Sequence, residues 1–196
     1  MDESPSGCWT NHHSITEYNG QWYLFYHHND YSPNFDKNRS ARIDSLFFNT
    51  DGTIKKVKPT LRGVGITDAR SKIQIDRYST ISPYGVTIDY LEPSNTFEGW
   101  QTLFNRAGTW VTYNKVDFGT TPVKRLKARV RSEKGGAITL RTPGEKGMTI
   151  AELPIKPTGK WTEISTNVSN APTSMQDLII TQTGENPVAV DWISFE

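Results

Sequence analysis

The chain has 196 residues, of which 22 are Lys or Arg and 21 are Asp or Glu, so its formal net charge at pH 7 is +1. This near-neutral balance lacks the cationic excess that drives binding to a phosphate backbone, so nucleic acid is not expected as a partner. No apolar run approaches the roughly 20 residues that cross a bilayer, and no membrane association is expected. The length allows one well-packed core and a second small unit.

The N-terminal residues show neither a disulfide framework nor a secretory leader. Cys8 is the single cysteine, so an intrachain disulfide is impossible. Residues 1–8 contain two acidic residues and no hydrophobic stretch, unlike a signal peptide. We expect either a cytoplasmic chain or a piece whose leader lies elsewhere.

Hydrophobic residues alternate with polar ones through nearly the whole chain, and no convincing segment of ten or more residues has apolar positions at helical spacing, which predicts an all-β protein. The first expected strands cover 14–18, 21–27, 42–49 and 53–58. Asn19-Gly20 joins the first pair, and this dipeptide tolerates the positive φ angles of a type I′ turn. Four antiparallel strands this rich in aromatic residues cannot bury both of their faces alone, so they resemble one blade of something larger.

Residues 59–68 contain a proline and two glycines, which is typical of a linker, and we place a boundary near Gly65. Beyond it, short strands follow at even spacing, with Gly and Pro turn signals between them. These expected strands cover 72–78, 86–90, 109–118, 125–132, 137–142, 148–155, 162–168, 177–183 and 188–195. Such a series is typical of a β-sandwich.

The first unit, residues 1–64, resembles over about residues 9–64 the last part of glycoside hydrolase family 43. The motifs that carry this resemblance are Asn11 to Ile15, Tyr18 to His27, Arg39-Ser40, Ile43-Asp44 and Asp51 to Ile54. The resemblance implies the final blade of a five-bladed β-propeller of β-xylosidases, α-L-arabinofuranosidases and arabinanases. It places His12 at the propeller centre and Arg39 within reach of substrate. The family's catalytic acids belong to earlier blades, so no catalytic residue is expected here and the chain alone is predicted to be inactive.

The second unit, residues 66–196, is similar to carbohydrate-binding module family 6. The motifs that carry this similarity are Ile75 to Tyr78, Gly108 to Gly119, Gly159-Lys160-Trp161 and Val190 to Phe195. Such modules are jelly-roll β-sandwiches that often follow family 43 catalytic domains. The expected fold is therefore an all-β jelly-roll β-sandwich, preceded by a four-stranded antiparallel propeller-blade remnant.

Sugar rings present C–H patches that lie flat on aromatic faces, so a binding cleft needs one or two exposed rings with polar groups at their edges. The resemblance implies Phe104 and Trp161 as these rings, and the alternative for both is a place in the core. The module's usual asparagine is replaced by Ala189, which should weaken or alter recognition. Asn186 and Asn105 are candidate substitutes.

Two further features follow from the resemblance. Some family members bind glycans on the concave sheet face, where Trp100, Tyr84 and Tyr113 are the candidate rings. The family also carries a structural calcium, whose ligands map to Asp76 and Asp191. Two carboxylates fill a shell of six to eight oxygens only with backbone help, so capping of a strand end is the alternative for Asp191.

The sequence thus predicts a module that binds xylan, arabinoxylan or arabinan and tethers a linked catalytic site to insoluble substrate. One alternative is that the chain completes a β-xylosidase or α-L-arabinofuranosidase whose catalytic blades are missing and act as its partner. Another is a structural spacer in which Ala189 marks a lost binding function. The resemblance implies an extracellular or periplasmic location for the parent enzyme.

Overall fold

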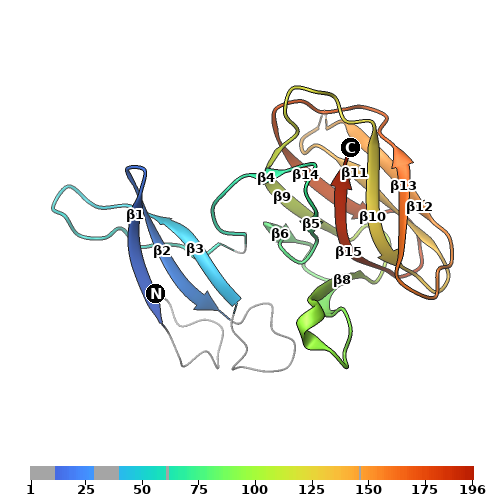
Figure 1. Cartoon of the computed structure of the whole chain (residues 1–196), viewed down its shortest axis with the longest axis horizontal. Helices are drawn as coiled ribbons and strands as arrows, with labels where there is room; N and C mark the ends of the chain where they lie inside the picture. Colours follow the sequence, from blue (N-terminus) through green and yellow to red (C-terminus); the bar gives the residue numbers. More distant parts are fainter. Residues whose placement is uncertain (1–11, 29–39, 61, 146) are drawn as a thin grey trace. The chain divides into compact units, whose positions relative to one another are not determined.

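The computed structural model describes residues 12–28, 40–60, 62–145 and 147–196. The chain divides into two compact units, Met1–Val64 and Gly65–Glu196, and the division falls beside the boundary expected near Gly65. In the described ranges every regular element is a strand except one short 3-10 helix (Figure 1). The predicted all-β class is therefore confirmed. None of the described helical residues forms a segment long and apolar enough to span a membrane.

The first unit contains a three-stranded antiparallel sheet in the order β1-β2-β3. Its strands are β1 (His13–Tyr18), β2 (Gln21–His28) and β3 (Ser40–Leu46). The turn between β1 and β2 has positive φ at both central residues, 49° at Asn19 and 76° at Gly20, as a type I′ turn requires. The hairpin expected at this dipeptide is confirmed.

The fourth strand expected in this unit, 53–58, is wrong. Only an isolated bridge between Phe48 and Ile54 forms there. The turn itself is built as expected, because the Asp51 carboxylate accepts hydrogen bonds from the Thr53 backbone N–H (3.0 Å) and hydroxyl (2.6 Å). Past the bridge, Val57 is the residue that packs against the small core of this unit, so little apolar surface draws the segment into the sheet.

The second unit is a sandwich of two six-stranded sheets. Sheet I has the order β13-β10-β15-β8-β7, with β5 beside β15. Sheet II has the order β12-β11-β14-β9-β4, with β6 beside β9. The strands of sheet I are β5 (Ile73–Gln74), β7 (Val86–Tyr90), β8 (Trp100–Phe104), β10 (Arg125–Arg131), β13 (Thr162–Asn167) and β15 (Val188–Phe195). Those of sheet II are β4 (Thr67–Asp68), β6 (Thr80–Ile81), β9 (Trp110–Asp117), β11 (Gly136–Arg141), β12 (Thr149–Ile155) and β14 (Met175–Gln182).

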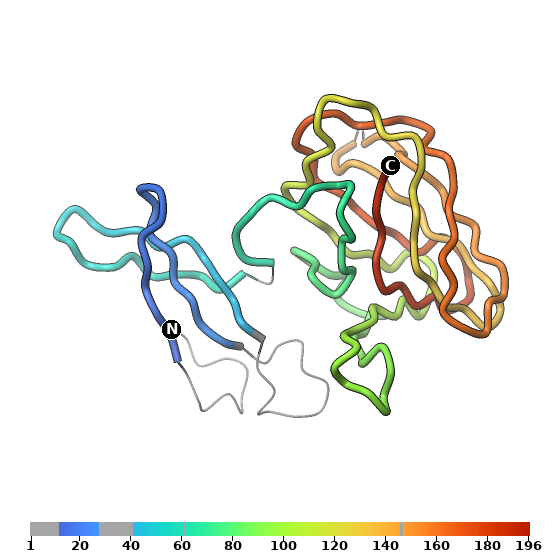
Figure 2. Tube along the Cα trace, in the orientation of Figure 1, coloured from blue at the N-terminus to red at the C-terminus, as the bar shows by residue number. Residues whose placement is uncertain are grey.

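Strand β8 was not predicted from the sequence, because the polarity of its residues does not follow the usual alternation of buried apolar and exposed polar side chains. Thr102, a polar residue, is fully buried, whereas the apolar neighbour Leu103 lies on the other face and is only half-buried. The expected strand 72–78 shortens to Ile73–Gln74. The 3-10 helix η1 (Thr96–Glu98) lies between β7 and β8, in a segment that projects away from the sheets (Figure 2).

The core of the sandwich lies between the two sheets and follows the alternation of each strand. On β10, for example, Leu126, Ala128 and Val130 are fully buried, while the intervening residues lie on the outer face. Phe118 and Phe195 meet edge to face with 5.0 Å between ring centroids. Sheet I therefore presents one face to this core and the other to solvent.

Candidate functional site

A row of paired residues crosses the solvent-facing side of sheet I. The register pairs Leu103 on β8 with Ala189 on β15, and Ala189 with Arg131 on β10. Directly paired residues project from the same face of a sheet, and their Cβ atoms are close neighbours. The small side chain of Ala189 thus lies between two large ones, which leaves a depression in the sheet surface.

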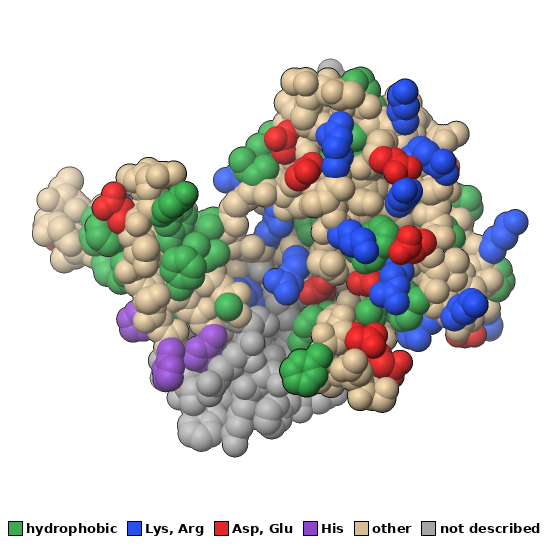
Figure 3. Space-filling view, in the orientation of Figure 1, with side chains coloured by type: hydrophobic (Ala, Val, Ile, Leu, Met, Phe, Trp, Pro, Cys, Tyr) green, Lys and Arg blue, Asp and Glu red, His purple; other side chains and the backbone are tan. Residues whose placement is uncertain are grey.

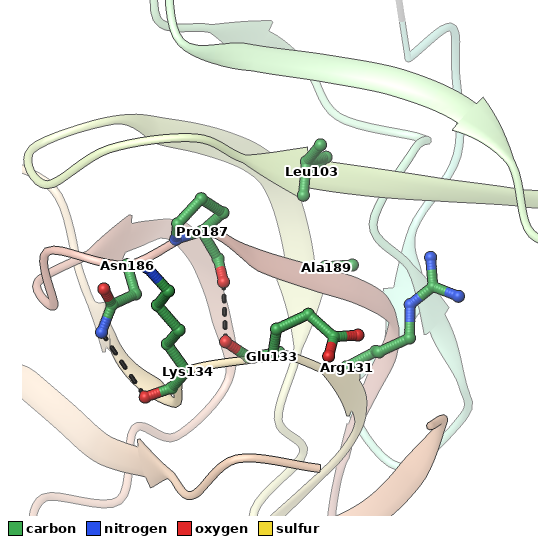
Figure 4. Close-up of a pocket in the computed structure, with 8 residues that line it drawn as sticks. Leu103, Arg131, Glu133, Lys134, Asn186, Pro187 and Ala189 are labelled. Atoms are coloured by element: carbon green, nitrogen blue, oxygen red, sulfur yellow. Dashed lines mark hydrogen bonds between the residues drawn. The ribbon is translucent and has the colours of Figure 1, made fainter. Parts of the chain in front are cut away.

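This depression opens into a cleft of about 560 Å³. Its walls come from β8, β10, β15, the turn after β10 and the loop before β15. The lining residues are Leu103, Arg131, Ser132, Glu133, Lys134, Asn186, Pro187 and Ala189. Figure 4 shows Ala189 with the Arg131 guanidinium on one side and Asn186 and Pro187 on the other.

Hydrogen bonds hold the rim of the cleft in place. The Ser132 hydroxyl lies 2.7 Å from the Pro187 carbonyl oxygen, which ties the turn after β10 to the loop before β15 (Figure 4). The Ser132 backbone N–H donates to the Thr158 hydroxyl (3.0 Å), and the Thr158 N–H donates back to the Ser132 carbonyl (2.8 Å). The rim is therefore preorganised, which lowers the entropic cost of binding a ligand.

Trp161 lies beside the cleft, immediately before β13. Its side chain is half-buried, so it is not a core residue. The Arg131 and Arg129 guanidinium carbons lie 5.1 Å and 5.4 Å from the centroid of its ring. Both distances are within the range of cation–π attraction. The indole Nε1 is buried and has no hydrogen-bond partner among the described residues.

The two arginines differ in their polar partners. Arg129 Nη1 lies 2.6 Å from Asp191 Oδ2, so this guanidinium is neutralised. Within the described ranges Arg131 forms no ion pair, and its one side-chain hydrogen bond runs from Nη2 to Gln101 Oε1 at 3.5 Å. Elsewhere on the face of the second unit shown in Figure 3, Lys and Arg are interspersed with Asp and Glu.

The predicted ring at Phe104 is corrected by the structure. Phe104 is fully buried and faces the core, so neither face of its ring is available to a sugar. Successive residues on a strand point to opposite faces, and the neighbour on the cleft side is Leu103. Of the two candidate amides, Asn186 lines the cleft and Asn105 does not.

The other aromatic candidates have distinct environments. Tyr113 is fully buried, which removes it as a contact on the sheet face. Trp100 stacks on Tyr90 with 4.7 Å between centroids, and Tyr84 is exposed with the Arg106 guanidinium 4.5 Å from its ring centroid.

Phe97, on η1, is 98% exposed, and it was not named as a candidate aromatic contact from the sequence. Its position between a proline and a glycine in a polar segment was the available signal.

Asp76 and Asp191 come together from the two ends of the second unit, because the Ile75 N–H donates to the Asp191 carbonyl (3.0 Å). Burial raises the pKa of Asp76, and the Arg77 guanidinium, 3.1 Å away, offsets part of this rise. Burial also raises the pKa of Asp191, against the opposing effect of Arg129. In the described ranges Arg77 donates to Oδ2 of Asp76 and Arg129 donates to Oδ2 of Asp191, and the backbone N–H of Asp76 also hydrogen-bonds its own carboxylate.

The two residues expected near a propeller centre are only partly described. His12 is exposed, and its ring lies 5.8 Å from that of His27. Arg39 lies outside the described residues. Across 12–28, 40–60, 62–145 and 147–196, no group of three or more His, Cys, Asp or Glu side chains is placed to hold a metal ion.

Two known proteins are similar to most of this chain. The arabinoxylan arabinofuranohydrolase of Paenibacillus polymyxa is 28% identical over 186 residues, which cover 89% of this chain and 29% of that protein. The chain thus spans under a third of the length of this relative. The family 43 arabinoxylan arabinofuranohydrolase of Bacillus subtilis was solved with cellotetraose. Its structure is similar to this chain with a TM-score of 0.67 and 24% identity, and the match covers 94% of this chain and 40% of that chain. The N-terminal region aligns with the C-terminal part of such a family 43 enzyme.

The second unit alone is similar to isolated modules. A family 6 carbohydrate-binding module of Clostridium cellulolyticum, solved with xylose, has a TM-score of 0.58 and 28% identity, over 66% of this chain and 99% of its own. A family 36 module solved with calcium and xylotriose shares the fold at a TM-score of 0.50 and 14% identity. Residues 81–196, more than half of the chain, match the family carbohydrate binding module (family 6), and the chain belongs to this family.

Proposed function

We propose that the second unit is a non-catalytic module that binds a xylan-type polysaccharide in the cleft beside Trp161. The observation that carries this proposal is a preorganised depression over Ala189, flanked by the half-buried indole of Trp161 and the Arg131 guanidinium. Such a site combines an apolar surface for the C–H face of a sugar with polar groups at its edge. Membership of carbohydrate-binding module family 6 supports the same function.

The names of the relatives support the choice of polysaccharide. Arabinoxylan arabinofuranohydrolase is the name of the Paenibacillus polymyxa relative, and the Clostridium cellulolyticum module is solved with xylose. We propose xylan and arabinoxylan as the first ligands to test, with arabinan next. Contact with one indole and a shallow depression leaves most of a sugar hydrated, so affinity for a single chain should be modest.

The proposed role is attachment of a catalytic domain to insoluble substrate. The alignment of the N-terminal region with a family 43 enzyme supports a parent glycosidase in which a propeller precedes the module. Tethering raises the effective concentration of the catalytic site near the polysaccharide without any new contact at that site. Because its substrate lies outside cells, we propose that the parent enzyme is extracellular or periplasmic.

We also propose that calcium can bind between Asp76 and Asp191. The residues fit a clip of this kind in part, since two buried carboxylates from the two chain ends offer hard oxygen ligands. Arg77 donates to Oδ2 of Asp76, and Arg129 donates to Oδ2 of Asp191. Bound calcium would supply positive charge that offsets the burial of both carboxylates and would fasten the middle of β15 to the turn that follows β5.

Affinity electrophoresis of the whole chain through gels that contain xylan, arabinoxylan, arabinan, β-glucan or hydroxyethyl cellulose tests the proposed function. We expect xylan or arabinoxylan to retard the chain, and Trp161→Ala to migrate as in an empty gel. Trp22→Ala, in the first unit, is the matched aromatic control and should be retarded like the wild type. Equal mobility of the wild type in all gels would favour a structural spacer.

A further inference from the structure

The Arg131 guanidinium lines the cleft without a carboxylate partner in the described part of the chain. It is half-buried, and its contact with Gln101 Oε1, at 3.5 Å, is at the long end of the hydrogen-bond range. Arg129, two residues earlier, is by contrast held at 2.6 Å by Asp191. Because a guanidinium carries five N–H donors, most of those on Arg131 remain available for a ligand.

The surroundings of Arg131 fix the direction of these donors. The Trp161 ring lies 5.1 Å away, and a guanidinium near an aromatic face is preorganised because it is planar. Cross-strand pairing places Ala189 beside Arg131 and Leu103 beyond it. A ring that lies flat over Ala189, with one edge toward Leu103 and the opposite edge toward Arg131, would therefore direct an equatorial substituent at the guanidinium.

Among the residues that line the cleft, positive charges outnumber negative ones by one, and Glu92, which interacts with Arg131 from outside the lining, offsets this difference. Among the lining residues Arg131 and Lys134 are cationic and Glu133 is anionic. Glu133 is exposed and forms no ion pair within the described ranges. Glu92 is also exposed, and hydrogen bonds from the Ser94 backbone and hydroxyl, with a smaller contribution from Arg131, lower its pKa.

We propose that this cleft binds an acidic glycan, a xylan-type chain that carries a uronic acid, and that Arg131 pairs with the carboxylate. This inference rests on the proposed function, because it names the class of sugar that occupies the same cleft. A planar guanidinium binds a carboxylate through two parallel hydrogen bonds, which a neutral hydroxyl cannot reproduce. Arg131 is then the residue that determines specificity, while Trp161 and Leu103 supply contact area.

Isothermal titration of the whole chain with three ligands of equal backbone length tests the inference. The ligands are a neutral xylo-oligosaccharide, the same backbone with one glucuronic acid branch, and that branch with its carboxyl group reduced to an alcohol. We expect about tenfold tighter binding of the acidic ligand at low salt and the loss of most of this preference at high ionic strength. The reduced ligand should bind like the neutral one.

Three variants locate the effect. Arg131→Gln should remove the preference, so that the acidic and the neutral ligand bind with equal affinity. Glu133→Gln should increase affinity for the acidic ligand by about twofold, because it removes a like charge from the cleft. Arg141→Gln, on the exposed side of β11 in sheet II, is the matched control and should change neither affinity.

The outcomes separate this inference from the proposed function. Equal affinity for acidic and neutral ligands, with both lost in Trp161→Ala, would overturn the acidic preference and leave glycan binding in place. An acidic preference that survives Arg131→Gln would overturn the role of this arginine. No binding of any of the three ligands would overturn the proposed function itself.

Discussion

Replacing Phe104 with alanine should destabilise the sandwich and spare glycan binding by the folded protein. Phe104 is fully buried. In sheet I it pairs with Val86 of β7 on one side and with Val188 of β15 on the other. Truncation of a buried phenylalanine to alanine costs about 3–5 kcal/mol, which combines the lost transfer free energy with that of the cavity left behind. Because domains are stable by about 5–15 kcal/mol, the variant should keep its fold with a much lower unfolding midpoint.

Urea denaturation followed by tryptophan fluorescence measures this loss, and isothermal titration at low temperature measures glycan affinity of the folded variant. Asn105→Ala is the matched control, because its side chain is exposed and outside the cleft. It should change the unfolding free energy by less than about 0.5 kcal/mol. If Phe104→Ala cost less than about 1 kcal/mol and abolished binding, the assignment of this ring to the core would be refuted.

The remaining predictions concern the indole, the amide position and the buried carboxylates. Trp161→Ala should lower glycan affinity by at least about tenfold and the unfolding free energy by less than the buried Phe104 truncation, as measured by titration and urea denaturation. Ala189→Asn should raise affinity for a neutral xylo-oligosaccharide by about two- to tenfold, since it adds an amide to the cleft floor, and an unchanged affinity would exclude that contact. Calcium should raise the thermal midpoint at pH 7 over that in a chelator, and Asp76→Asn should remove this shift. Without calcium, Asp76 binds its proton more tightly in the folded than in the unfolded state, because burial raises its folded pKa. We therefore compare the unfolding free energies of the wild type and Asp76→Asn as a function of pH. The wild-type value minus the variant value should fall as pH rises from about 4 through the folded pKa of Asp76. A difference that rises with pH would contradict a raised pKa for Asp76.

Local sequence signals predicted much of the fold because they depend on neighbouring residues. Asn19-Gly20 adopts the positive φ angles that the turn demands, and alternation identified the long strands of the sandwich. The fourth strand of the first unit failed because Val57 alone offers apolar contact where a strand was expected. Strand β8 was missed because buried Thr102 and half-buried Leu103 reverse the usual polarity of the two faces.

The site was harder to predict because it depends on strand register. Phe104 and Leu103 differ by one position, which decides whether a side chain enters the core or the cleft. The sequence singled out Trp161 as a candidate ring and Ala189 as a departure from the module's pattern, but gave no reason to choose Arg131. Its importance follows from pairing across β10 and β15, which only the structure shows.

The carboxylate pair illustrates the same limit. The sequence placed Asp76 and Asp191 near each other through resemblance alone, and in the structure a backbone hydrogen bond from the Ile75 N–H to the Asp191 carbonyl joins the two segments. Their arginine partners differ in origin. Arg77 is the next residue in the chain, whereas Arg129 comes from the adjacent strand β10 and could not be paired with Asp191 from the sequence.

The most direct test of the binding cleft is an NMR titration of the chain, labelled with nitrogen-15, with a xylo-oligosaccharide. Trp161 Nε1–H is a useful probe because the indole lies beside the cleft and this group has no hydrogen-bond partner in the part of the chain that the structure describes. We predict that its signal and the backbone amide signals of Leu103, Arg131 and Ala189 shift together and saturate with one affinity. Saturable shifts confined to residues around Tyr84 or Phe97, with these four unchanged, would contradict the assignment of the cleft.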